Sequence, residues 1–405
     1  MRQRSTPTDP YVDVYVIGAG PAGLAVAATL RTRGLRAAVL DRGASVGDSW
    51  RRQYDRLHLH TPRELSGLPG LPIPREMGRW VARDDVATYL ERYAAHHDLD
   101  VRLGTEVARV DPDGRGWRLT LVDGSALTAP FVVVATGFNH TPREPDVPGL
   151  ASWPGRLVPA RDYRSGADLA GQDVLVVGTG NTGTEIAVDL AEHGAARVRL
   201  AVRTVPHILR RNRGPYAAQY TGIAVRRLPR GLVDRVAPFV ERLTTPDLTA
   251  HGLPRPDTGL LCRVEDDNAI PVQDVGIIDA VRSGAVEPVA ALAQVDGDAI
   301  VLADGSRLTP DAIVLATGYT AALEPLVGHL GVLDGKGLPV ERGGQVARGA
   351  VGLWYTGFTN PISGMLREMA IDARKIALSV ALAKRRRTAE LRTGTEPVTP
   401  RRAPR

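Results

Sequence analysis

Two glycine-rich segments of this 405-residue chain have the spacing that binds the pyrophosphate of a dinucleotide. Each segment follows a short apolar, β-rich run, at residues 11–17 and 173–177, and each precedes a helical pattern. In G-x-G-x-x-G spacing the first glycine permits a tight turn, the second lets the backbone approach a pyrophosphate, and the third lets the helix pack against the strand. The glycines are Gly18, Gly20 and Gly23 in the first segment and Gly178, Gly180 and Gly183 in the second. The spacing therefore predicts two dinucleotide sites.

The two units differ in charge at the end of their second strand. A strand at residues 35–40 ends at Asp41, whose carboxylate can accept hydrogen bonds from ribose hydroxyls. The corresponding strand of the second unit ends at Arg203 and Thr204, with no carboxylate. A carboxylate repels a 2′-phosphate, whereas a guanidinium pairs with it. The first site is therefore expected to take a nucleotide with a free 2′-hydroxyl, and the second NADPH, unless Arg203 is an ordinary surface arginine.

Two near-identical segments support FAD as the permanently bound nucleotide. FVVVATGF at residues 131–138 and AIVLATGY at residues 312–319 each read as a buried strand that ends in Ala-Thr-Gly. Such strands commonly mark the chain crossings between the nucleotide domains of two-dinucleotide flavoproteins. GLWYTGF, at residues 352–358, precedes a helix expected from Met365 to Ala383, and the N-terminus of that helix suits the flavin ring. FAD and NADPH are therefore the predicted cofactors.

Composition and charge argue against several other classes of protein. The basic excess within residues 384–405 equals the whole net charge of +6, so the rest of the chain is neutral and no nucleic-acid partner is expected. No apolar run is long enough to span a membrane and no secretory signal opens the chain, so a cytoplasmic location is expected. The single cysteine, Cys262, can form no redox pair, which argues against a thioredoxin-reductase-like enzyme.

The histidines do not predict a metal site. His58 and His60 are close together in LHLHTP, but no carboxylate accompanies them. No catalytic triad is apparent from the spacing either. The spacing of the residues therefore predicts neither a metal centre nor a triad.

Collinear motifs along the chain resemble the flavin-containing monooxygenases that hold FAD and NADPH on one polypeptide, and most closely their YUCCA-type branch. The resemblance covers roughly residues 10–380, in GAGPAG, SWRRQYDRLHLHTPREL, VVATGF, WPGRLVPARDYRSG, VVGTGNTG, HGLPRPDTG, IPVQDVG, IVLATGY and GLWYTGFT. It implies an α/β fold of two Rossmann-like, three-layer domains, with an NADPH-binding domain inserted in a discontinuous FAD-binding domain. The expected boundaries are 10–155 and 319–382 for the FAD domain, 156–318 for the NADPH domain, 1–9 for an N-terminal extension and 383–405 for a disordered basic tail.

The same resemblance implies a reaction. NADPH reduces the flavin, O₂ adds to it as a C4a-hydroperoxide, and one oxygen atom passes to a small organic substrate. The YUCCA-type branch converts indole-3-pyruvate to indole-3-acetate, so a 2-oxo acid or a nitrogen or sulfur nucleophile is the expected substrate. A Baeyer–Villiger or N-hydroxylating enzyme shares this cycle and stays open, as does an uncoupled NADPH oxidase or redox sensor. The oligomeric state is open too, with a homodimer among the possibilities.

The resemblance also assigns roles to individual residues. His60 stands where many family members have an asparagine near the reactive flavin edge, so it is expected to bond to the flavin, the NADP⁺ or the peroxide, with a structural role as the alternative. Asn360 is expected to line the flavin pocket, and these two are the expected catalytic residues. Besides the glycines, Asp41, Arg203 and Thr204, the residues expected to contact the cofactors are Pro21, Ala22, Arg42, Gly47, Trp50, His58, Thr61, Val107, Ala135, Thr136, Gly137, Asn181, Thr182, Ala316, Thr317, Gly318 and Tyr319.

Two regions need separate comment. Residues 207–270 resemble the insertion that covers the active site, and its arginines Arg210, Arg211 and Arg213 either meet a substrate carboxylate or form a solvated face. In WPGRLVPARDY, Pro159 stands where the family pattern aromatic-x-Gly-x-x-x-His-x-x-x-aromatic has a histidine. Because no step of the cycle needs a proton transfer there, this change is expected to affect a hinge or the support of NADP⁺, and the lifetime of the peroxide, rather than the chemistry itself.

Overall fold

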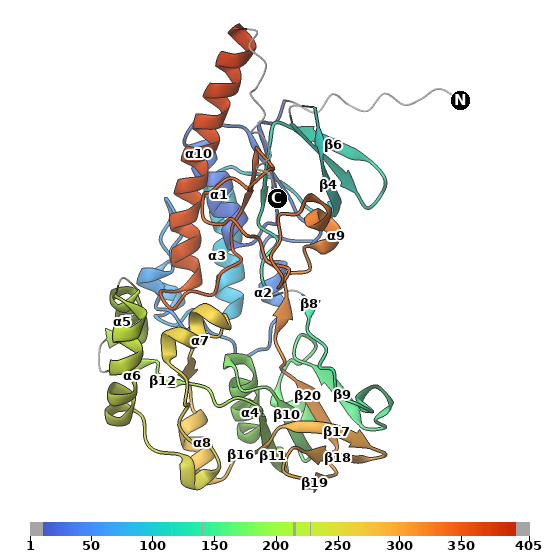
Figure 1. Cartoon of the computed structure of the whole chain (residues 1–405), viewed down its shortest axis with the longest axis vertical. Coiled ribbons are helices and arrows are strands. Elements are labelled where there is room, and N and C mark those ends of the chain that lie inside the picture. Colours follow the sequence, from blue (N-terminus) through green and yellow to red (C-terminus); the bar gives the residue numbers. More distant parts are fainter. Residues whose placement is uncertain (1–10, 115, 140, 214–215, 227, 394–405) are drawn as a thin grey trace, which may run out of the picture.

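Two five-stranded parallel sheets form the framework of the molecule (Figure 1). The computed structural model describes residues 11–393 except residues 115, 140, 214–215 and 227. The first sheet has the strand order β22-β7-β1-β2-β3, and every neighbouring pair in it is parallel. Its strands are β1 (Val14–Ile17), β2 (Ala37–Leu40), β3 (Asp100–Arg102), β7 (Phe131–Val134) and β22 (Leu353–Tyr355). Such buried parallel strands need apolar residues on both faces, which explains their valine-rich sequences.

The second sheet has the order β16-β11-β10-β20-β9 and is also parallel throughout. Its strands are β9 (Arg156–Pro159), β10 (Asp173–Val177), β11 (Arg197–Val202), β16 (Glu287–Ala290) and β20 (Ala312–Leu315). All of these strands come between β7 and β22 in the chain, so the second unit is inserted in the first. This arrangement confirms the predicted α/β fold of two Rossmann-like units.

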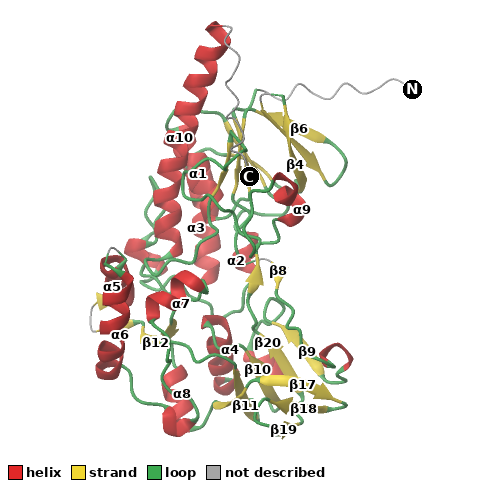
Figure 2. Cartoon of the chain, in the orientation of Figure 1, coloured by secondary structure: helices red, strands yellow, loops and turns green. Residues whose placement is uncertain are grey.

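Helices cover the sheets and complete the two cores (Figure 2). The helices packed around the first sheet include α1 (Pro21–Arg31), α3 (Arg83–His96) and α10 (Met365–Thr393), and those of the second include α4 (Asn181–Glu192) and α8 (Ile277–Ser283). In the first core Val14 and Val16 of β1 are completely buried in a cluster with Leu24 of α1. In the second core Val174 and Ile186 are buried in the same way.

Two chain crossings lie side by side between the units. β8 (Thr141–Pro142) leads out of the first unit and β21 (Tyr319–Thr320) leads back, and the two strands pair antiparallel. Each crossing follows one of the Ala-Thr-Gly segments, at residues 135–137 and 316–318. Two antiparallel sheets flank the framework, formed by β4 (Val107–Asp113), β5 (Gly116–Leu121) and β6 (Ala126–Ala129), and by β17 (Leu292–Asp296), β18 (Ala299–Leu302) and β19 (Arg307–Leu308). The remaining short helices of the units are α2 (Asp48–Arg51) and α9 (Glu324–Val327).

The expected insertion is a helical layer that leaves and rejoins the second unit. Its elements are β12 (Ile208–Arg210), β13 (Asn212–Arg213), β14 (Tyr216–Ala217), α5 (Ala218–Val225), α6 (Arg230–Thr244), α7 (Leu260–Asp266) and β15 (Val272–Asp274). β12 pairs in parallel with β15, which brings the two ends of the insertion together. In Figure 1, α5, α6 and α7 lie beside the N-terminal end of α10. The insertion is therefore placed to cover the junction of the two units.

The end of the chain differs from the expectation. Helix α10 ends at Thr393, whereas the sequence was expected to leave the helix at Ala383 and continue as a disordered tail. Residues 384–393 contain neither glycine nor proline, and their long side chains favour helix. The expectation of disorder from Ala383 onward, which was based on the basic composition, was therefore wrong for these residues. The Lys384 ammonium also lies 2.7 Å from the buried Asp13 carboxylate. Residues 1–10 and 394–405, which hold the expected N-terminal extension and the rest of the tail, lie outside the described residues.

None of the helices that the structure describes combines the length and the apolar character that crossing a bilayer needs. The longest, α10, carries a run of basic residues from Lys384 to Arg387 within it.

Candidate functional site

A cavity of about 2180 Å³ is lined by residues of both units. Pockets for one drug-sized ligand usually measure about 300–1,000 Å³, so this cavity has room for more than one ligand. Both glycine turns lie on its wall, and so do His60 and Asn360. Of the residues expected to contact a cofactor, all of which the structure describes, only Gly23 and Gly183 are absent from the wall. The fold thus brings together residues that are dispersed along most of the chain.

The first glycine turn is shaped by contacts that only glycine permits. Gly18 has a φ of 113°, and a Cβ atom there would lie 2.4 Å from the Ala135 carbonyl oxygen. A Cβ on Gly23 would lie 1.9 Å from the Gly18 carbonyl oxygen, which explains why Gly23 packs behind the turn and not on the wall. Gly20, in contrast, has no atom within 4 Å of its Cβ position. A pyrophosphate can therefore approach the backbone at the open side of Gly20.

The second glycine turn repeats this geometry. Gly178 has a φ of 122°, and its Cβ would lie 2.3 Å from the Ala316 carbonyl oxygen. A Cβ on Gly183 would lie 1.9 Å from the Gly178 carbonyl oxygen, while Gly180 again has no atom within 4 Å. Helices α1 and α4 begin at the two turns without a side-chain cap or an acidic residue in the first turn. Their N-terminal N–H groups can therefore bind phosphate, and both turns fit a dinucleotide.

The two strand ends carry opposite charges on the cavity wall. Asp41 Oδ2 accepts a hydrogen bond from the Ala19 N–H at 2.6 Å, and its Oδ1 accepts one from the Gly43 N–H at 2.6 Å. A carboxylate has about four lone-pair sites, so Asp41 fixes the turn and retains capacity to accept from ribose hydroxyls. At the second site Arg203 and Thr204 are exposed on the wall. The geometry thus fits FAD at the first site and a 2′-phosphorylated nucleotide at the second.

The two neighbouring histidines have different surroundings. His60 is partly buried, and its Nε2 atom lies 2.7 Å from a carboxylate oxygen of Glu185 on α4. His58 is exposed, and its Nδ1 donates to the Arg56 carbonyl oxygen at 2.7 Å. Among the residues that the structure describes, no three His, Cys, Asp or Glu side chains are grouped so that they could hold a metal ion. Glu185 could not be identified from the sequence, because the sequence does not show whether an acid on a helix is buried or solvated.

Asn360 ties the insertion to the segment that precedes α10. Its Nδ2 donates to the Asn268 carbonyl oxygen at 3.2 Å, and its backbone N–H donates to Asn268 Oδ1 at 3.2 Å. Gln219 of α5 reaches the same segment, because its Nε2 donates to the Ser363 carbonyl oxygen at 2.7 Å. Asn360 thus shapes the wall, while its direct contact with a cofactor stays a prediction. Gln219 and Asn268 are further wall residues that sequence reasoning did not identify.

Other predicted contact residues also hold the wall in place. Asn181 Oδ1 accepts from the Gln273 N–H at 2.7 Å, which joins the second glycine turn to β15. The hydroxyls of Thr61 and Ser66 lie 2.8 Å apart. The buried hydroxyl of Thr136, in contrast, has no hydrogen-bond partner within the described part of the chain. Trp50 both lines the cavity and packs against the first core.

The insertion helices give part of the cavity an aliphatic wall. The side chains that form it come mainly from α5, α6 and α7: Val225, Leu228, Leu232, Val233, Val236, Ala237, Val240, Leu260 and Ile362. Arg263, Asn268 and Lys336 line the same cavity and add a few polar groups. Binding sites for small molecules usually combine an apolar wall with a small number of placed polar groups. This region therefore suits a substrate with an apolar body and one polar or anionic group.

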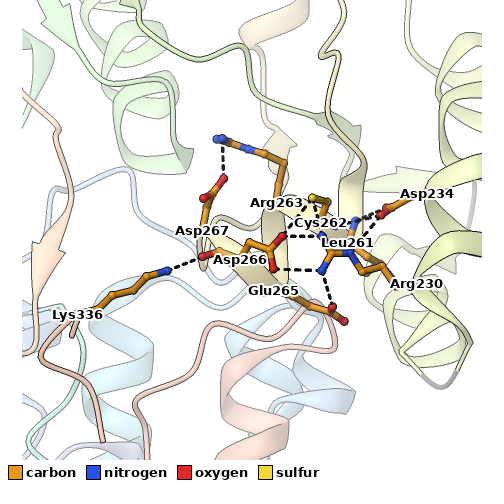
Figure 3. A network of polar contacts seen from close by, with 9 residues as sticks. All are labelled: Arg230, Asp234, Leu261, Cys262, Arg263, Glu265, Asp266, Asp267 and Lys336. Carbon is orange, nitrogen blue, oxygen red and sulfur yellow. Dashed lines mark hydrogen bonds and ion pairs between the residues drawn. The ribbon is translucent and has the colours of Figure 1, made fainter. Parts of the chain in front are cut away.

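A polar network holds α7 on α6 (Figure 3). Asp234 of α6 accepts from two backbone N–H groups at the start of α7, at 2.7 and 3.2 Å, as an N-cap side chain would. Arg230 donates to Asp266 at 2.6 Å and to the Cys262 sulfur at 2.7 Å. Lys336, which lies outside the insertion, donates to the Asp266 carbonyl oxygen at 2.5 Å. The single cysteine is therefore part of a structural contact, and it does not line the cavity.

The arginines considered for a substrate carboxylate are placed differently. Arg210 is exposed, and neither Arg210 nor Arg211 lines the cavity. The Arg211 guanidinium stacks on Trp80, 4.4 Å from the ring centroid, and burial lowers its pKa. The side chain of Arg213 lies outside the described residues. Arg211 therefore joins the insertion to the loop that carries Trp80, and a substrate carboxylate would have to meet other groups.

WPGRLVPARDY forms β9 of the second unit and the turns on either side of it. Trp153 Nε1 donates to the Asp298 carbonyl oxygen at 3.1 Å, and the Tyr163 hydroxyl donates to Asp189 Oδ2 at 2.6 Å. Burial, followed by the hydrogen bond to Asp189, raises the pKa of Tyr163. Pro159 is the last residue of β9, an edge strand, where no further strand needs its missing N–H. Pro159 is not among the residues that line the cavity.

Known proteins are similar to this chain in sequence and in architecture. The family model described as pyridine nucleotide-disulphide oxidoreductase matches residues 15–214. An indole-3-pyruvate monooxygenase of Oryza sativa subsp. japonica, YUCCA1, is 38% identical over 351 residues, which cover 85% of this chain and 86% of that protein. A probable indole-3-pyruvate monooxygenase of Arabidopsis thaliana, YUCCA9, is 34% identical over 90% of this chain and 88% of its own length. The redox-active cysteine pair of thioredoxin-reductase-like enzymes would need a second cysteine, which the chain lacks.

Solved structures agree with this relationship. A flavin-containing monooxygenase from Stenotrophomonas maltophilia superposes with a TM-score of 0.71 at 25% identity, covering 92% of this chain and 99% of that one. An open crystal structure of cyclohexanone monooxygenase shares the fold, with a TM-score of 0.67 at 21% identity over 93% of this chain and 88% of its own. The cavity, its two glycine turns and these relatives lead to one assignment. The chain belongs to the FAD- and NADPH-dependent flavin-containing monooxygenases, and within them to the YUCCA-type branch.

Proposed function

We propose that this enzyme uses NADPH and O₂ to oxidise a small 2-oxo acid with loss of its carboxylate. The balanced reaction converts R–CO–COOH, O₂, NADPH and H⁺ into R–COOH, CO₂, H₂O and NADP⁺. The observation that carries this proposal is that both glycine turns and the aliphatic wall of the insertion line one cavity. Two cofactors and a substrate with an apolar body can therefore meet without leaving the protein. The relatives named as indole-3-pyruvate monooxygenases supply the 2-oxo acid class.

The bound flavin, once reduced by NADPH, supplies the activation of O₂. The chain's own residues supply binding, orientation and the exclusion of water. Gly20 and Gly180 leave space for the two pyrophosphates, while Asp41 and Arg203 distinguish the two ribose groups. The insertion covers the cavity with side chains that do not attract water, and a dry site protects reactive oxygen species from side reactions. This division of roles requires no acid–base triad and no metal ligand.

A substrate panel tests the proposed reaction. Purified enzyme with NADPH and air is offered indole-3-pyruvate and phenylpyruvate as 2-oxo acids, and a cyclic ketone, a tertiary amine and a thioether as the other classes. We expect one CO₂ and one shortened acid per NADPH with a 2-oxo acid, and mainly H₂O₂ with the rest. Efficient lactone formation would assign a Baeyer–Villiger enzyme, and an N-oxide or N-hydroxylated product would assign an N-oxygenating enzyme. H₂O₂ as the main product with every compound would assign an NADPH oxidase.

Arg203 is expected to select NADPH over NADH. Its guanidinium is the charged group at the end of β11 on the cavity wall, where a 2′-phosphate would lie. Losing one charge-assisted hydrogen bond costs about 1.5–3 kcal/mol, so Arg203→Ala should raise the KM for NADPH about tenfold to 100-fold. The KM for NADH should stay within about twofold, because NADH has no phosphate to lose. Steady-state kinetics with both nucleotides measure the two changes.

Arg210→Ala is the matched control for this prediction. Arg210 is also an exposed arginine close to the end of β11, but it does not line the cavity. Both KM values should therefore stay unchanged in Arg210→Ala. If Arg203→Ala changes the two KM values by the same factor, Arg203 does not read the 2′-phosphate.

A further inference from the structure

Glu185 is a carboxylate buried between the two nucleotide units. It lies on α4 of the second unit and is only 2% exposed. Burial of an ionised carboxylate is costly unless charged or hydrogen-bonding partners surround it. The other acid buried on α4, Asp189, finds its partners within its own unit, in the Tyr163 hydroxyl and the Gly166 N–H. Glu185 is different, because its partners belong to the first unit.

Two side chains of the loop before and around His60 lie against it. The Nε2 atom of His60 lies 2.7 Å from Glu185 Oε1, and Tyr54 lies close enough to the same carboxylate for its charge to act on the hydroxyl. Burial, followed by the charge of Glu185, raises the pKa of Tyr54 well above its ordinary value. Tyr54 therefore remains a donor.

The short contact determines which ring nitrogen of His60 carries the proton. An imidazole lone pair and a carboxylate oxygen at 2.7 Å would repel each other, so a proton must lie between Nε2 and Glu185. A neutral imidazole has one such proton, and its Nδ1 is then an acceptor. Nδ1 is buried, and neither Nδ1 nor Glu185 Oε1 has a partner in hydrogen-bond geometry within the described part of the chain, although His60 lies on the cavity wall. Buried acceptors normally have a hydrogen-bond partner, so His60 Nδ1 is expected to accept from a donor on a bound molecule.

We propose that Glu185 is a positioning residue that holds His60 with Nε2 protonated, so that Nδ1 can accept a hydrogen bond from an N–H or O–H group of the bound cofactors. The identity of that donor rests on the proposed function, whereas the orientation of the ring follows from the protein contacts alone. Thr182 and Glu185 both belong to α4. The helix that begins at the second glycine turn therefore also carries the carboxylate that contacts His60.

Nitrogen NMR of the histidines tests the orientation without any turnover. The purified, FAD-loaded enzyme is labelled with ¹⁵N-histidine, and His60→Ala identifies the His60 signals among those of the nine histidines. We expect a protonated Nε2 and an unprotonated Nδ1 at His60 in the wild-type enzyme near neutral pH, and a mixture of both forms in Glu185→Gln. A His60 ring protonated on Nδ1 alone in the wild-type enzyme would overturn the proposal, and this result does not depend on the folding of Glu185→Gln.

A double-mutant cycle tests the role in the reaction. The measured quantity is the fraction of consumed NADPH that appears as H₂O₂ in the presence of substrate. Glu185→Gln and His60→Ala should each raise the H₂O₂ fraction about tenfold. In metal sites, removing the carboxylate that orients a ligating histidine costs about 10–100-fold in affinity or activity, and the expected effect lies at the lower end of that range. The double variant should be no worse than either single variant, because both changes disable one unit. If the effect of the double variant on the H₂O₂ fraction equals the product of the two single effects, Glu185 does not act through His60.

Glu192→Gln provides the matched control. Glu192 lies on the same helix and pairs with Arg56 of the same loop, but its side chain is 57% exposed. We expect this variant to leave both the His60 signals and the H₂O₂ fraction unchanged. If the wild-type enzyme transfers oxygen to no compound of the panel, the proposed function fails, whereas the NMR result still decides whether Glu185 orients His60.

Discussion

Replacing Gly20 by alanine is expected to give a folded protein that cannot retain FAD. The residue has φ −83° and ψ −177°, which alanine adopts without strain, and no atom lies within 4 Å of its Cβ position. The added methyl group would therefore meet nothing in the protein itself. It would occupy the space through which a pyrophosphate reaches the backbone N–H groups of α1. We expect the Kd for FAD to rise at least about 100-fold, equivalent to about 2.7 kcal/mol.

Gly23→Ala separates a lost ligand contact from a damaged fold. A Cβ on Gly23 would lie 1.9 Å from the Gly18 carbonyl oxygen, so the backbone must move, at a cost of about 3 kcal/mol or more. The unfolding midpoint of the FAD-free protein should therefore fall in Gly23→Ala and stay unchanged in Gly20→Ala. The flavin absorbance that remains after gel filtration measures retention. A Gly20→Ala enzyme that holds FAD as tightly as the wild type would show that the pyrophosphate does not approach this turn.

The two glycine turns could be predicted from sequence because their shape depends on residues close together in the chain. Gly18, Gly20 and Gly23 lie in one strand–turn–helix unit, where Gly18 has a positive φ and Gly23 packs on the Gly18 carbonyl oxygen. The charge at the end of the next strand is a local feature as well, which is how Asp41 and Arg203 could be compared. Motifs of this kind are readable because spacing alone fixes their geometry.

The contacts that complete the cavity were not readable in this way. Asn268 and Asn360 are 92 residues apart, and Gln219 and Ser363 are 144 apart, so only the folded chain brings them together. On α4 no periodicity distinguishes Glu185, buried between the units, from the exposed Glu192 two helical turns away. The sequence likewise left open whether Arg211 meets a substrate carboxylate or forms a solvated face, since its stacking on Trp80 depends on how the insertion docks. Local patterns thus identified the cofactor turns, while docking of distant segments decides the rest.

Gly222→Ala is expected to uncouple the enzyme by lifting the insertion from the cavity. Gly222 lies on α5, is buried and lines the cavity, and its Cβ would be 2.3 Å from the Ile362 carbonyl oxygen. The clash is with backbone, so α5 has to move away from the segment that Gln219 and Asn360 hold. A misplacement of about 1 Å can cost an enzyme up to about 100-fold in rate. We expect product formed per NADPH to fall at least about tenfold, while NADPH oxidation continues and H₂O₂ replaces the product.

Gly231→Ala shows whether this effect belongs to docking or to any added methyl group in the insertion. Gly231 is an exposed residue of α6, has no atom within 4 Å of its Cβ position and does not line the cavity. Alanine is a better helix former than glycine, so this variant should be at least as stable as the wild type and equally coupled. If Gly222→Ala stays coupled as well, close contact between α5 and Ile362 is not what keeps water from the reaction, and the aliphatic wall must seal the cavity without it.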